Sequence, residues 1–156
     1  MAREFNVPVI EDAAEALGSE INNKPCGGFG DFGILSFNGN KIITTSGGGA
    51  LLSNDPEIIE KAKFLASQSR DSAPHYQHSH IGYNYRMSNV LAGIGRGQIE
   101  VLPDRVNSRR ANFQRYVDYF SVLNKNGFDV QFQEEPNGYY SNRWLSCILL
   151  NPALNN

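Results

Sequence analysis

The sequence has 156 residues, of which 40% are hydrophobic, 11% aromatic and 19% charged. These values exclude a disordered chain, a coiled coil and a collagen-like repeat. The formal net charge of −2 argues against nucleic acid or an anionic membrane as the main partner. The apolar runs are far shorter than the ~20 residues of a membrane helix. Two cysteines form no disulfide scaffold or zinc motif. We therefore expect a globular, cytoplasmic α/β protein.

The first part of the chain alternates short apolar runs with glycine-rich segments. Residues 7–10 predict a buried strand that ends at two carboxylates, and residues 34–37 predict a second strand. Residues 42–44 and 50–53 predict a pair of strands joined through three glycines. Eight of the fifteen glycines lie in one 23-residue window, at positions 27, 28, 30, 33, 39, 47, 48 and 49. Because such density is typical of turns and of backbone close to a ligand, we expect the functional site there.

The second part is predominantly helical. Asp55, followed by proline and glutamate, is a strong signal for the start of a helix. Ser88 predicts the cap of a second helix that runs to about Leu102, and Pro103 begins a third that ends near Gly127. The remaining predicted elements are a loop over 70–82 and two strands near 128–133 and 144–150.

One glycine motif suggests a nucleotide site that its context does not support. Residues 28–33 match G-x-G-x-x-G, which binds a pyrophosphate only where it follows a strand and opens a helix. Here a loop precedes the glycines and a strand follows them, so we assign no dinucleotide site. We also assign no metal site to His75, His78 and His80, because their polar segment is more typical of a surface loop.

Lys41 and Asp12 are the candidate functional residues of the first part. A lysine between an apolar strand and a β-rich segment fits a neutral amine that forms a Schiff base, or a point charge on a phosphate. A lysine that extends from a loop to solvent fits the same pattern. Asp12 ends a predicted strand, where α/β proteins bind ligands, and a buried carboxylate there needs a cation or hydrogen-bond donors. A purely structural carboxylate is the alternative.

Five motifs in a fixed order carry more information than any single residue. They are IEDAAEALGS (10–19), GDFG (30–33), SFNGNK (36–41), GGGA (47–50) and GYNYRM (82–87). In this combination, residues 5–120 closely resemble the DegT/DnrJ/EryC1/StrS family of sugar aminotransferases, which depend on pyridoxal 5′-phosphate. The resemblance implies a fold-type I, α/β architecture. Residues 1–103 would form part of the cofactor-binding large domain, a mostly parallel sheet flanked by helices, and residues 104–156 a linking helix and part of a smaller α+β domain.

The resemblance also implies roles for individual residues. Lys41 would be the catalytic lysine that forms the Schiff base with the cofactor and then shuttles a proton. Asp12 would pair with the pyridinium nitrogen, so that the ring acts as an electron sink. Ala14 would lie against the ring, Glu15 beside the cofactor, and Ser36 on its phosphate.

Further implications concern the reaction and the assembly. Asn84 would reach the phosphate in the neighbouring subunit, so the resemblance implies a homodimer. The reaction would aminate a nucleotide-linked keto-sugar, with glutamate as the usual donor, for surface polysaccharide or glycan biosynthesis. Because family chains are longer, we expect a chain truncated at both ends. The alternatives are a non-catalytic remnant that folds and self-associates without turnover, and a domain that binds a phosphate ligand through residues 27–49.

Overall fold

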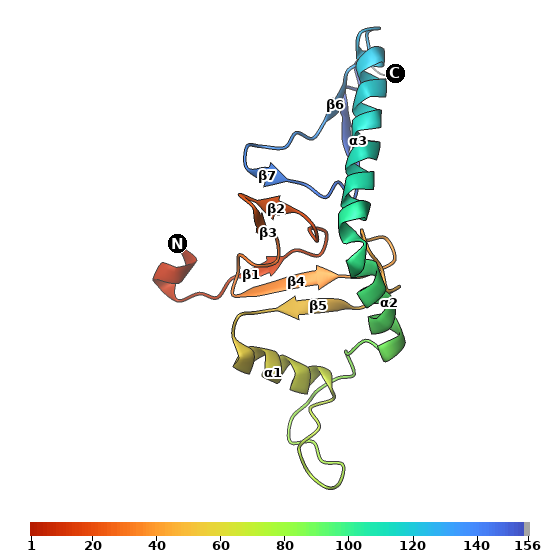
Figure 1. Ribbon diagram of the computed structural model, residues 1–156. Coiled ribbons are helices and arrows are strands. Elements are labelled where there is room, and N and C mark those ends of the chain that lie inside the picture. The colour runs from red at the N-terminus through yellow and green to blue at the C-terminus, as the bar shows by residue number, and fades with distance from the viewer. Residues whose placement is uncertain (155–156) are drawn as a thin grey trace.

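The computed structural model of the protein describes residues 1–154, which form helices and three small sheets (Figure 1). The elements are η1 (Ala2–Phe5), β1 (Ile10–Asp12), β2 (Glu20–Ile21), β3 (Lys24–Pro25), β4 (Phe32–Ser36), β5 (Gly49–Leu52), α1 (Pro56–Ala66), α2 (Asn89–Glu100), α3 (Leu102–Asn124), β6 (Val130–Phe132), β7 (Tyr139–Tyr140) and β8 (Ile148–Leu150). Among the described helices, none combines the length and apolar character that crossing a membrane requires.

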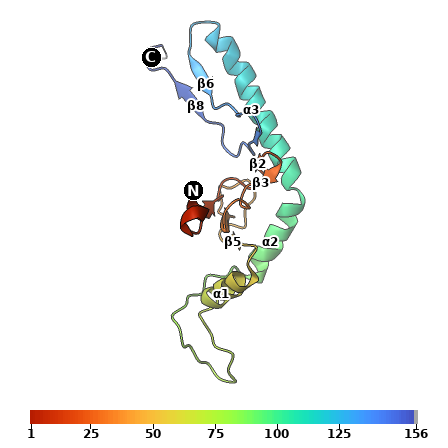
Figure 2. The same ribbon diagram turned by 90° about the vertical axis from the view of Figure 1, so that its left-hand side faces the viewer.

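The three sheets place distant parts of the chain next to one another. In the first, β4 pairs in parallel with β1 and antiparallel with β5. The second has the order β3-β2-β7, so residues 139–140 pair with residues 20–21. The third consists of β6 and β8, whose pairing is antiparallel. Figure 2 shows α2 and α3 along one side of the molecule, with the sheets beside them.

The predicted strand over 42–44 is wrong. Only the second member of the predicted pair forms, as β5, and its partner is β4. Ile42 and Ile43 are instead 9% and 2% exposed within an irregular loop. The loop folds back because the backbone N–H of Thr45 donates to the carbonyl of Phe37, at 3.0 Å. Ile42 and Ile43 therefore anchor this loop in the core and do not belong to a strand of a sheet.

The prediction of a buried strand over 7–10 is also wrong. β1 begins only at Ile10, and that side chain is 65% exposed. The exposed side chains of β1, Ile10 and Asp12, point to the same face of the sheet, and that face is not covered within the described residues. A short apolar run looks the same in a sequence whether the faces of its strand are covered or exposed.

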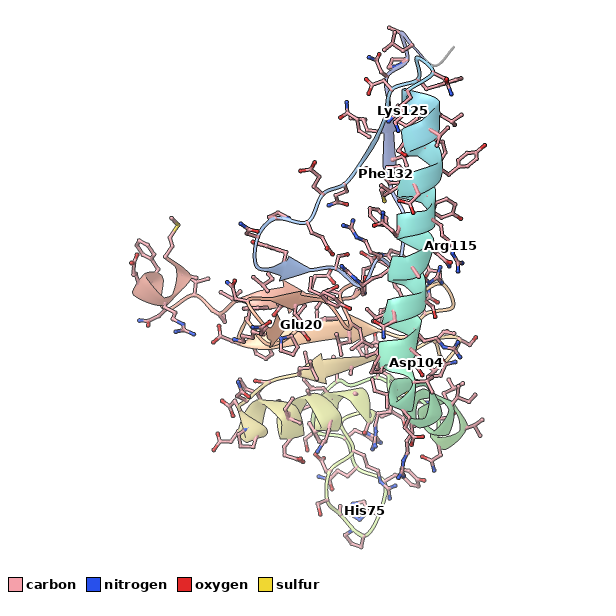
Figure 3. All side chains as sticks on the ribbon, turned by 45° about the horizontal axis from the view of Figure 1, so that its top comes forward. Glu20, His75, Asp104, Arg115, Lys125 and Phe132 are labelled. Carbon is pink, nitrogen blue, oxygen red and sulfur yellow. The ribbon has the colours of Figure 1, made fainter. Side chains whose placement is uncertain are left out.

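The helices start where their capping residues predict. The carboxylate of Asp55 accepts from the N–H of Glu57 and of Ile58, at 2.9 and 3.3 Å, at the start of α1. Ser88 caps α2 through the N–H of Leu91, at 3.3 Å. These bonds satisfy N–H groups that have no partner within the helix. The predicted loop over 70–82 also forms, with His75 at its far end (Figure 3).

Part of the core lies where the turn after β1 meets α3. Its buried apolar residues include Ala13, Ile43 and Val106. Gly18 has a φ of +83°, and a side chain there would collide with Val106 of α3. The absence of a side chain at Gly18 therefore allows the turn to approach the helix closely. Farther along α3, Phe113 packs edge-on against Phe132 of β6, with ring centroids 5.4 Å apart.

Candidate active site

Five of the predicted site residues lie at, or just after, the carboxyl ends of β1 and β4 in the first sheet. Asp12 ends β1 and Ser36 ends β4, and these two strands are parallel neighbours. Their carboxyl ends therefore meet at the same edge, which is where open α/β sheets bind ligands. Ala14 and Glu15 follow directly after β1, and Lys41 lies in the loop after β4. The topology thus brings both segments to one side of the sheet.

Lys41 is held by two side chains. Its Nζ lies 2.6 Å from Oε1 of Glu15 and 4.6 Å from the ring centroid of Trp144. The lysine side chain is only 11% exposed, whereas that of Glu15 is 56% exposed. The first distance is that of a charge-assisted hydrogen bond, and the second lies within the range of a cation–π interaction. The alternative in which Lys41 extends into solvent is therefore wrong.

The backbone around Lys41 fixes where its side chain begins. Its N–H donates to the carbonyl of Asn38, at 3.1 Å, which closes a tight turn after β4. The two buried isoleucines that follow, Ile42 and Ile43, anchor the loop on the other side. Because both flanks are fixed, the lysine emerges at a defined position beside the sheet edge.

Asp12 and Ser36 lie at the two strand ends. Oδ1 of Asp12 accepts from the N–H of Ala14, at 3.1 Å, and Oγ of Ser36 accepts from the N–H of Asn38, at 3.3 Å. Asp12 is exposed, so the predicted buried carboxylate is wrong, for the same reason that the strand itself is not buried. The carboxylate is nevertheless accessible to a cationic group that approaches the sheet edge.

Asn84 belongs to another part of the molecule. It forms an isolated bridge with Ser67, directly after α1. Its neighbours Tyr83 and Tyr85 stack with their ring centroids 5.3 Å apart, and all three residues are exposed. Within the described part of the chain, Asn84 thus contacts the residue that follows α1, whereas Lys41 contacts Glu15, just after the carboxyl end of β1.

Glu11 is a partly buried anchor whose role the sequence did not reveal. Its carboxylate accepts from the N–H groups of Gly27, Phe29 and Gly30, at 2.6, 2.7 and 3.4 Å. Burial acts to raise the pKa of Glu11, but these three hydrogen bonds outweigh it and hold the pKa below its ordinary value. Two backbone N–H groups of the G-x-G-x-x-G segment, those of Phe29 and Gly30, thus bind a carboxylate of the protein itself, and the segment leads into a strand. This agrees with assigning no dinucleotide site.

Comparison with known proteins gives the family. The sequence model of the DegT/DnrJ/EryC1/StrS aminotransferase family matches residues 1–155. The chain belongs to this family. EpsN of Bacillus subtilis (strain 168), whose name assigns it as a pyridoxal phosphate-dependent aminotransferase, is 57% identical over 150 residues. That alignment covers 96% of this chain and 38% of EpsN. A GDP-perosamine synthase of Vibrio cholerae is 37% identical over 94% of this chain and 39% of its own length.

Solved structures of aminotransferases share the fold. The aminotransferase TlmJ of Streptoalloteichus hindustanus has a TM-score of 0.87 and 31% sequence identity, over 99% of this chain and 41% of TlmJ. The expected α/β fold class is therefore confirmed. The chain spans about two fifths of the length of the relatives that it matches.

Two further residues of this family member contact the site and were not predicted. Trp144 lies over Lys41, and Asn142 is 2% exposed between Trp144 and the turn after β1. Trp144 is the single tryptophan of the chain, but the signal in the sequence was weak because it lies about a hundred residues after Lys41. A rare, large aromatic residue in a polar segment is a reason to look for a contact, but its partner cannot be read from spacing.

Proposed function

We propose that this chain carries the pyridoxal 5′-phosphate site of a sugar aminotransferase, with Lys41 as its catalytic lysine. The observation that carries the proposal is the position of the Lys41 amine. It is largely shielded from solvent, contacts Glu15 and Trp144, and lies beside the carboxyl ends of two parallel strands. A shielded primary amine at such an edge is what covalent attachment of an aldehyde requires.

The residues around Lys41 fit the groups of this cofactor. The exposed carboxylate of Asp12 would hold a proton on the ring nitrogen, and the hydroxyl of Ser36 would bond the phosphate. Ala14 offers a small side chain for the face of the ring, and Glu15 would hold the lysine amine. The cofactor, when bound, supplies the electron sink for carbanion chemistry. Lys41 itself would take up and return the proton that moves during the transfer.

The substrate class rests on the relatives. A matching protein of Vibrio cholerae is named GDP-perosamine synthase, which indicates an amino sugar carried by a nucleotide. We propose a nucleotide-linked keto-sugar as acceptor and glutamate as amino donor. We further propose that residues 1–103 belong to the cofactor-binding domain and residues 104–156 to a linking helix and a smaller domain.

The test is a direct search for the attachment site. The purified chain is mixed with pyridoxal 5′-phosphate and reduced with borohydride, and the modified lysines are then mapped by mass spectrometry. We expect the pyridoxyl group mainly on Lys41. Lys63 is the internal control, because it forms a similar ion pair with Glu60, at 2.7 Å, but is 59% exposed. A Lys41→Ala variant should lose the specific modification while leaving that of Lys63 unchanged.

The alternative, a remnant without cofactor chemistry, predicts a different distribution. Modification would then follow exposure, with Lys63 ahead of Lys41, and Lys41→Ala would bind the cofactor as the parent does. That result would overturn the proposed function. An Asp12→Asn variant adds a second criterion, because loss of the carboxylate should weaken cofactor retention without removing the amine.

A further inference from the structure

One buried amide connects the two residues that contact Lys41. The Nδ2 group of Asn142 donates to the backbone carbonyls of Glu15 and Leu17, at 2.8 and 2.9 Å. Its Oδ1 accepts from the N–H of Trp144, at 3.1 Å, and its own N–H donates to Oγ of Ser19, at 2.9 Å. Both N–H bonds and the carbonyl of the side-chain amide are therefore used inside the protein.

The position of Asn142 follows from the second sheet. β7 pairs with β2, so that Tyr140 lies opposite Glu20. Asn142 comes two residues after this pair, and Glu15 comes five residues before it. The strand pairing thus places the side-chain amide of Asn142 next to the turn that contains Glu15. Without this amide, the turn that contains Glu15 and the segment that contains Trp144 would lose the hydrogen bonds that connect them.

We propose that Asn142 is a positioning residue for Lys41. It fixes the backbone of Glu15 on one side and that of Trp144 on the other, and these two side chains contact the lysine amine at 2.6 and 4.6 Å. The amide acts through both neighbours and does not touch Lys41 itself. That the positioned amine serves amino transfer rests on the proposed function, whereas the positioning rests on the hydrogen bonds alone.

Two variants separate the functions of the amide. Asn142→Ala removes every side-chain hydrogen bond of this residue. Asn142→Asp keeps the shape and the acceptor for Trp144, but it replaces two N–H donors with an oxygen that faces the carbonyls of Glu15 and Leu17. Both changes release the turn that carries Glu15, and only Asn142→Ala also removes the bond to Trp144.

The experiment measures how well Lys41 is covered, without any cofactor. Limited acetylation with acetic anhydride is followed by mass spectrometry, and the rate at Lys41 is divided by that at Lys63 in the same sample. We expect this ratio to rise roughly tenfold in Asn142→Ala, the factor that one to two lost hydrogen bonds produce in an opening equilibrium. The fluorescence of Trp144, the single tryptophan, should shift to longer wavelengths in the same variant.

Ser69→Ala is the matched control. Ser69 is the other fully buried polar side chain among the described residues, and its hydroxyl donates to the carbonyl of Ile81, at 3.1 Å. Its loss removes a buried hydrogen bond away from Lys41. We expect an unchanged acetylation ratio and unchanged emission in Ser69→Ala, with far-ultraviolet circular dichroism reporting that each variant is folded.

An unchanged ratio and emission in folded Asn142→Ala or Asn142→Asp would overturn the proposal. If both variants fail to fold, Trp144→Leu tests the same arrangement with Asn142 intact. Removing the ring should then raise the acetylation ratio of Lys41, and an unchanged ratio would contradict the proposed cover. A Lys41 that is protected from acetylation through Asn142, yet is not modified by pyridoxal 5′-phosphate, would refute the proposed function and leave the positioning role standing.

Discussion

At the scale of single residues, Glu11 and Asp12 take opposite roles although they are adjacent. The side chain of Glu11 turns inward to three backbone N–H groups, and that of Asp12 lies exposed at the sheet edge. The alternation of side chains along a strand explains the difference, because successive residues point to opposite faces. One carboxylate thus shapes the glycine-rich segment, and the other is accessible to a ligand.

The first prediction concerns Glu11. Replacement by glutamine retains the size of the side chain but removes the charge that accepts three N–H donors. We expect Glu11→Gln to lower the free energy of unfolding by about 1–3 kcal/mol at neutral pH, as measured by urea denaturation. Glu100→Gln, an exposed change of the same kind on α2, should stay within about 0.5 kcal/mol. Equal effects in the two variants would contradict the anchoring role.

At the scale of elements, a bidentate ion pair fastens α3 to the segment around β7. Arg110 of α3 donates to both carboxylate oxygens of Glu135, at 2.6 and 3.0 Å, and to the carbonyl of Ser141, at 2.6 Å. Glu135 also accepts from the N–H of Ser141, at 2.7 Å, and lies 3.6 Å from Nε of Arg143. Hydrogen bonding from Arg110 lowers the pKa of Glu135, despite the opposing effect of burial.

This pair predicts a pH dependence with a definite sign. A carboxylate whose pKa is lower in the folded state stabilises the fold above its ordinary pKa, and this contribution is lost as the pH falls through the folded value. We expect the free energy of unfolding to fall below a pH of about 4.3, the ordinary value for glutamate. Glu135→Gln should flatten this dependence and cost about 1–3 kcal/mol at neutral pH, because both partners are only partly buried.

The neighbouring Glu134 provides the control for this experiment. It is exposed and has the same charge, so Glu134→Gln makes an equal change in net charge. Its variant should retain the acid-dependent loss of stability in urea titrations between neutral and acidic pH. A pH profile that is identical in Glu135→Gln and in the parent would show that the pair does not fasten the two elements.

At the scale of the whole molecule, several large apolar side chains close to Asn84 in the sequence are exposed and define a face around Asn84. Ile81, Tyr83, Tyr85 and Val90 are between 57% and 83% exposed. Such side chains, close together in sequence and unprotected from water, favour contact with another protein surface. Because Asn84 lies among them and away from Lys41, we propose that this face meets a second copy of the chain and presents Asn84 to its site.

The corresponding prediction is tested by sedimentation equilibrium. We expect the mass of a dimer, twice the 17.3 kDa of one chain, and a shift towards the monomer in Tyr85→Ser. Tyr76→Ser is the control, because Tyr76 is 79% exposed, close to the 76% of Tyr85, but follows His75 at the far end of the 70–82 loop. A strictly monomeric parent chain, or equal effects of the two variants, would count against the proposed interface.

Features that depend on neighbours along the chain could be predicted from the amino-acid sequence. Asp55 and Ser88 begin helices because a capping side chain bonds N–H groups two or three residues away. The order of five motifs gave the family before any contact was known. Strand 42–44 was wrongly predicted, because apolar residues can be buried in a loop as well as in a ladder.

The closure of the site depends on contacts that form only in the folded chain. The contact of Trp144 with Lys41, and the amide of Asn142 that joins Trp144 to Glu15, depend on the pairing of β7 with β2. The exposure of Asp12 depends on what covers the face of the sheet to which its side chain points. Local sequence fixes turns and caps through short-range hydrogen bonds. Contacts between residues far apart in the chain arise only when the whole fold pays the entropy of bringing them together.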